Sequence, residues 1–152
     1  MIRTILAVLI TVALFAVAVP AIDQAAGARG DQQAEATAAE IEHAAKSLYV
    51  AEDAPPEGVT GPRRLVSVSL PTDGLTLDPV SSFTIEPVAT NHTVIRYSVD
   101  GRQTKVVHVE APLVGPDYGS IEYGQITGEH RFRLTLERHP DEGYPVVVIE
   151  RL

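Results

Sequence analysis

The segment that decides the fold is Thr4–Ile22, TILAVLITVALFAVAVPAI, which contains nineteen residues and no charge. A helix rises about 1.5 Å per residue, so this segment would be about 28 Å long, close to the hydrocarbon thickness of a bilayer. Its apolar side chains occur on every face of that helix, which is typical of a helix surrounded by lipid or by a large core. A chain of 152 residues has no core of that size. The pattern therefore predicts a membrane anchor, residues 1–22, that contacts lipid through residues 4–22.

A cleaved secretory signal is the alternative explanation for this segment. The basic start Met1–Arg3 fits such a signal, and Ala16–Ala18 or Ala26–Ala28 has the small-x-small pattern of a cleavage site. The apolar segment is longer than the roughly 7–15 residues of a usual signal core, which favours a retained anchor. In both cases the basic N-terminus is expected in the cytoplasm and the rest of the chain outside the membrane.

The chain is acidic and contains no cysteine, with a formal net charge of −8 and only two lysines among its 12 basic residues. An acidic excess with few lysines is typical of proteins from salt-loving archaea; an ordinary acidic protein from a GC-rich genome is the alternative. Nucleic acid is not expected as a partner, because phosphate contacts require a basic surface. Without disulfides, a domain outside the cytoplasm must be stabilised by packing alone.

Residues 23–50 are predicted to form a helical stalk, because the Ala-rich segment Asp31–Leu48 consists of strong helix formers. Its apolar side chains recur at spacings of three and four, as on one face of a helix. We expect this apolar stripe to pack on the chain's own domain, with an assembly face for a partner as the alternative; its members are Ala34, Ala38, Ile41, Ala45 and Leu48. Pro20, Gly27 and Gly30 predict a kink and an interruption, which would give one long broken rod or two helices with a flexible joint.

Residues 51–62 are rich in proline and glycine and predict a linker, after which the hydrophobic period changes to two. This alternation predicts half-buried strands around residues 66–70, 83–86, 95–99 and 132–136. Residues 145–149 are apolar on both faces, which is typical of a central strand. We therefore expect residues 63–152 to form a small all-β domain, a mostly antiparallel sheet or sandwich of about six to seven strands.

Asp100 and Gly101, between two alternating segments, are the strongest hairpin signal in the chain. A two-residue turn at this point would place Arg96 opposite Lys105 on the paired strand. Like charges that face each other across two strands are mildly unfavourable, so we expect acidic neighbours on an adjacent strand.

The sequence contains no pattern that predicts catalysis, a metal site or a cofactor. A serine nucleophile needs a strained turn such as GxSxG, which does not occur. The segment 91–93 fits a glycosylation sequon at Asn91. The five histidines form no HxxxH or HExxH pair, and zinc-ribbon spacing requires cysteine; they are His43, His92, His108, His130 and His139. We therefore predict a non-enzymatic protein.

The order of a short basic start, an apolar helix, a helical stalk and a β-rich head resembles type IV pilin-like and pseudopilin-like membrane proteins of archaea, in particular haloarchaea. The pieces that carry this resemblance are Met1–Arg3, Thr4–Ile22, Asp31–Leu48 and the strands from Arg64 onward. It implies a single-pass protein that presents its head outside the cell in a type IV pilus-like or secretion-like assembly, with other pilin-like or secretion-system proteins as partners. A membrane-tethered or secreted binding module of unknown ligand is the alternative, and a tethered hydrolase is a third class.

Overall fold

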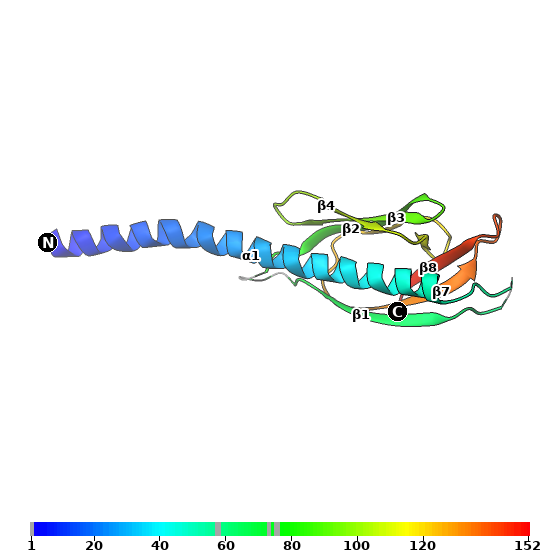
Figure 1. Cartoon of the computed structure of the whole chain (residues 1–152). Helices are drawn as coiled ribbons and strands as arrows, with labels where there is room; N and C mark the ends of the chain where they lie inside the picture. Colours follow the sequence, from blue (N-terminus) through cyan, green and yellow to red (C-terminus); the bar gives the residue numbers. More distant parts are fainter. Residues whose placement is uncertain (1, 57–58, 73, 75–76) are drawn as a thin grey trace.

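The computed structural model describes residues 2–56, 59–72, 74 and 77–152. These residues form one long helix followed by eight strands (Figure 1). Figure 1 shows the N-terminal half of the helix projecting away from the strands, whereas its C-terminal half lies against them. The elements are α1 (Ile2–Ala51), β1 (Arg63–Leu70), β2 (Val80–Ala89), β3 (His92–Val99), β4 (Lys105–Val109), β5 (Leu113–Val114), β6 (Ile121–Tyr123), β7 (Gly128–Arg138) and β8 (Pro145–Arg151).

The strands of the described residues form two four-stranded sheets, in the orders β1-β7-β8-β5 and β4-β3-β2-β6. Every pair is antiparallel except β5 with β8, so the predicted all-β domain with mostly antiparallel pairing is confirmed. There are eight strands because β5 and β6 contain only two and three residues, too few for an alternating pattern to be recognised. Residues 145–149 lie in β8, which is central in its sheet, as their apolar character on both faces predicted.

The connection between β3 and β4 is longer than a two-residue hairpin turn. The Arg102 N–H donates a hydrogen bond of 3.0 Å to the Val99 carbonyl and closes the turn around Asp100 and Gly101. Gly101 has a positive φ of 70°, but Asp100 does not. A two-residue turn of type I′ requires positive φ at both central residues, so the local backbone does not support the predicted turn.

The register of the β3–β4 pair consequently differs by one residue from the prediction. A slip of one residue changes which side chains face each other across the two strands. Arg96 lies opposite Val106 instead of Lys105 and forms an ion pair with Glu86 on β2. Lys105 lies opposite the buried Tyr97, so the predicted conflict between like charges does not arise.

The helix α1 is continuous from Ile2 to Ala51, so the predicted interruption is wrong. It passes through Pro20 and both glycines, and Figure 1 shows only a gentle bend in its projecting half. Residues 2–25 are exposed, whereas buried positions begin at Ala26 and include Gly27 and Gly30. Packing of a helix face supplies most of the stability of a protein helix, which explains why poor helix formers do not end α1 at this point.

The apolar stripe packs into the core of the same chain, as its spacing favoured. Residues 26–51 of α1 contact strands of both sheets, and we call residues 26–152 the head. The stripe shares one core cluster with Phe83, Tyr97 and Phe132. All five of its members are buried, and in this conformation they are not available to a partner; they are Ala34, Ala38, Ile41, Ala45 and Leu48. The predicted stalk is thus a layer of the head.

The helix ends where the predicted linker begins. α1 ends at Ala51, and Pro55 and Pro56 follow, which cannot continue a helix. The next element, β1, begins at Arg63. Glu57 and Gly58, which belong to the predicted linker, lie outside the described residues.

Candidate functional site

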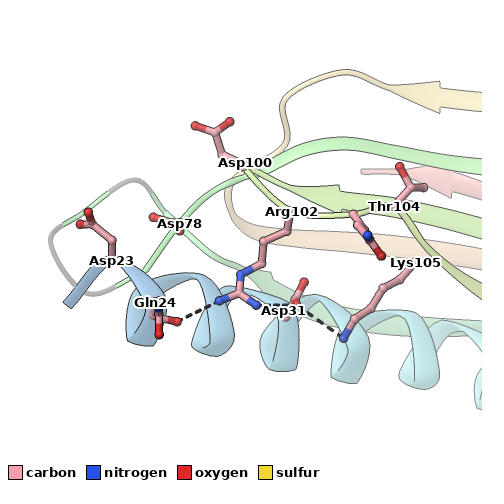
Figure 2. Close-up of a pocket in the computed structure, with 10 residues that line it drawn as sticks. Asp23, Gln24, Asp31, Asp78, Asp100, Arg102, Thr104 and Lys105 are labelled. Carbon is pink, nitrogen blue, oxygen red and sulfur yellow. Dashed lines mark hydrogen bonds and ion pairs between the residues drawn. The ribbon is translucent and has the colours of Figure 1, made fainter. Parts of the chain in front are cut away.

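A cluster of hydrogen bonds and ion pairs lies where the projecting part of α1 enters the head (Figure 2). We call it the junction; it consists of residues 23–35 of α1 and residues 100–105, which are the β3–β4 loop and the first residue of β4. Figure 2 shows the loop lying over the helix, with Arg102 and Lys105 directed towards it. The apolar segment ends at Ile22, so the junction begins at the next residue.

Arg102 clamps the loop to the helix. Its Nη2 donates a hydrogen bond of 2.9 Å to the backbone carbonyl of Gln24, and its Nη1 donates to Oδ2 of Asp31 at 3.4 Å. The side chain lies across Gly27, where a Cβ atom would be only 2.2 Å from the Arg102 Nε. Glycine therefore leaves the space in which the guanidinium reaches the helix backbone.

Lys105 adds a second cationic contact one turn further along α1. Its Nζ lies 3.3 Å from Oε2 of Glu35 and 3.6 Å from Oδ2 of Asp31. Arg102 and Lys105 therefore both contact the same carboxylate oxygen of Asp31, whose side chain is 13% exposed. Its other oxygen, Oδ1, is buried without a hydrogen-bond partner among the described residues. Burial raises the pKa of the neighbouring Tyr97 to about 12, with added repulsion from Glu35 and Asp31.

Gly30 brings the helix close to the strand ends behind the junction. A Cβ atom at this position would lie 2.6 Å from the backbone oxygen of Asp78 and 3.1 Å from Cγ1 of Val99. Such distances are shorter than ordinary van der Waals contact, so only glycine permits this approach without a shift of the backbone. Gly27 and Gly30 thus serve close packing between helix and head.

The C-terminal end of α1 also forms polar contacts with other parts of the head. Lys46 forms an ion pair with Glu110, and the hydrogen bond between them raises the pKa of Lys46 and lowers that of Glu110. The guanidinium of Arg64 on β1 donates a hydrogen bond of 2.6 Å to the hydroxyl of Ser47. Polar contacts at both ends of the packed half therefore supplement the apolar stripe between them.

A hollow of about 670 Å³ opens at the junction. The charged side chains that line it are Asp23, Asp31, Asp78, Asp100, Arg102 and Lys105. Among the described residues of the chain, no group of three side chains is arranged to hold a metal ion. The contacts of Arg102 and Lys105 hold the β3–β4 loop against α1.

Sequence reasoning identified the apolar stripe but not the junction. The contacts of Arg102 and Lys105 with α1 join residues about seventy positions apart, and no local pattern indicates such a pair. The spacing of the glycines does indicate the helix side of the junction, because Gly27, Gly30 and Ala34 follow one another at spacings of three and four, as on one helix face. They continue the stripe towards the apolar segment, although glycine by its helix propensity alone predicts a break.

A second, smaller hollow of about 280 Å³ lies at the end of the linker and the β7–β8 turn. Tyr118 lines it and has a positive φ of 62°, which is uncommon for a residue with a side chain. Its hydroxyl donates a hydrogen bond of 3.2 Å to Oε2 of Glu137, and its ring centroid lies 5.2 Å from that of His139. Pro56, Val59 and Pro140 supply apolar walls.

Comparison with known proteins gave one family match. A family model with the description "Domain of unknown function (DUF7311)" matches residues 1–152, which include the apolar segment, the junction and the head. No curated protein and no solved structure matches the chain significantly. The chain therefore belongs to the DUF7311 family.

Proposed function

We propose that the protein is a non-enzymatic, single-pass membrane protein that presents its head outside the cell. The observation that carries this proposal is the division of α1 at Ala26. Before it the helix is exposed and contains a segment long and apolar enough to cross a membrane; from it onward the helix is part of the head. Apolar surface in water costs about 25 cal/mol per Å², so the exposed segment needs lipid or other apolar helices around it.

The proposed orientation follows from charge. Arg3 precedes the apolar segment, and basic residues next to a membrane span favour the cytoplasmic side. The head on the other side is then extracytoplasmic. Its acidic character is in keeping with the proposal that it works in a salt-rich medium, where ions screen the repulsion between carboxylates.

We further propose that the protein is a pilin-like or accessory component of a type IV pilus-like or secretion-like assembly. The support is architectural, because one continuous helix contains both the proposed anchor and part of the head core. Association of such anchors in a membrane would fix the positions of their heads. Because the apolar stripe is buried in the head, contacts between anchors would use residues 4–22, which are exposed on every side.

A tethered binding module is the second candidate function, and the hollow beside Tyr118 favours it. Strained backbone conformations persist where the surrounding structure holds them, and they cluster at binding sites. The aromatic ring, the two prolines and the neighbouring Glu137 and Arg138 would suit a small ligand with both polar and apolar surfaces.

Membrane fractionation with N-terminal sequencing tests the anchor. After an alkaline carbonate wash, we expect the full chain in the membrane pellet with residues 4–22 retained. A Val12→Arg variant should be released to a large extent, because an arginine at the centre of a span costs about 2.5–3.5 kcal/mol on insertion scales. A wild-type chain that begins after Ala18 or Ala28 and is found in the medium would contradict the proposal.

The same membranes separate the two candidate functions. The chain has no cysteine, so a Leu9→Cys variant places a single thiol in the apolar segment. Cross-linked oligomers of this variant at natural expression levels would support assembly. A membrane-bound protein that stays monomeric would favour the binding module.

A further inference from the structure

The junction lies at a defined depth relative to the proposed anchor. If residues 4–22 fill the hydrocarbon core, the next five residues, 23–27, rise about 7.5 Å above it. A bilayer is about 40–45 Å thick with a core of about 30 Å, which leaves a headgroup layer of about 5–8 Å on each side. Residues 23–27 therefore lie within the headgroup layer.

The head touches the helix within this same short segment. Arg102 donates a hydrogen bond to the Gln24 carbonyl and lies across Gly27, so the β3–β4 loop is held at the depth of residues 24–27. Residues 100–104 are all exposed in the chain by itself. A Cβ atom at Gly101, at the tip of the turn, would meet nothing within 4 Å. The helix offers no spacer that would lift this loop away from the membrane.

We propose, on the basis of the membrane anchor proposed above, that the β3–β4 loop is a lipid-contacting surface that rests in the headgroup layer. The continuous helix and the Arg102 clamp seat the head directly on the bilayer. The acidic side chains Asp23 and Asp100 line the hollow at the junction, and neither has an ion-pair partner among the described residues. The contact is polar, and zwitterionic headgroups suit it because their ammonium groups can approach the carboxylates.

Fluorescence quenching in vesicles tests this contact on the full chain. Single cysteines at Gln103→Cys or Asn91→Cys carry a fluorophore, and the phosphatidylcholine vesicles contain a fraction of lipid with a nitroxide on its headgroup. Asn91 is exposed and lies at the opposite end of β3, which at eight residues is about 26 Å long. We expect several-fold stronger quenching of the label at position 103 than of the label at position 91.

Two further variants test the role of the clamp. In the Gln103→Cys protein, Arg102→Ala should lower the quenching, because the loop loses its bond to α1. The matched change Arg96→Ala removes an arginine from β3 outside the junction and should leave the quenching unchanged. Equal loss in both variants, or no loss in Arg102→Ala, would overturn the role of the clamp.

The outcomes separate this inference from the function on which it rests. Protein that floats with the vesicles but shows equal quenching at positions 103 and 91 overturns the headgroup contact and leaves the anchor intact. Protein that does not float with the vesicles overturns both.

Discussion

Replacement of Ile41 by aspartate should unfold the head. Ile41 lies at the centre of the apolar stripe, is 0% exposed, and belongs to the core cluster that joins α1 to both sheets. The change removes a buried branched side chain, at a cost of about 2–5 kcal/mol even for a truncation to alanine. It also places a carboxylate in an apolar site without a partner, which adds several kcal/mol. The sum approaches the whole stability of a small domain, which is about 5–15 kcal/mol.

Denaturant unfolding of the full chain in detergent, followed by near-ultraviolet circular dichroism, measures this effect. The control is Ala39→Asp, which introduces the same charge on the exposed side of the same helix turn. The control should lower the free energy of unfolding by only about 1 kcal/mol, because aspartate is a poorer helix former than alanine and lies three to four residues from Glu35 and Glu42. An Ile41→Asp protein with wild-type stability would mean that the stripe does not pack in the head.

Replacement of Gly30 by leucine should weaken the attachment of the helix to the strands. The Cβ atom alone would lie 2.6 Å from the backbone oxygen of Asp78, and backbone cannot rotate away as a side chain can. The gain in helix propensity from replacing glycine is at most about 1 kcal/mol. Overpacking in a core costs about 1–3 kcal/mol or more, so the steric effect exceeds the gain, and we expect a net loss of about 2 kcal/mol.

The control for this change is Ala28→Leu, two residues earlier on the exposed side of α1. It has a similar increase in size without a neighbouring strand, and its free energy of unfolding should stay within about 0.5 kcal/mol of the wild type. The same denaturation experiment measures both. Equal stability of the Gly30→Leu protein and its control would contradict the close approach of helix and head.

Much of this fold could be predicted from local patterns, because the core of a sheet imposes a strict alternation. The five main strands, the central place of β8 and the membrane-length helix all followed from periods of two or from continuous apolar sequence. The register of the β3–β4 pair did not, since it depends on the backbone angles of Asp100, which the Asp-Gly signal does not fix. The very short β5 and β6 depend on tertiary contacts.

Neither the junction nor the continuity of α1 could be predicted, because both depend on contacts between residues that are distant in sequence. Helix propensity treats Gly27 and Gly30 as unfavourable, but their effect is reversed where a helix must approach other backbone closely. Whether it must do so is decided by Asp78 and Arg102, which are distant in sequence. The apolar stripe could be recognised because its spacing is local, whereas the strands of the same chain that cover it lie far away in the sequence.

A distance between two spin labels shows whether one continuous helix joins the proposed anchor to the head. Ala18→Cys lies in the projecting half and Ala39→Cys in the packed half, both on exposed positions of a chain without cysteine. Over these 21 residues a continuous helix spans about 32 Å. Pulsed electron paramagnetic resonance on the full chain in vesicles should give a single narrow distribution centred at about that distance. A broad distribution, or one with shorter distances, would contradict the continuous helix and would restore the flexible joint at Gly27 and Gly30.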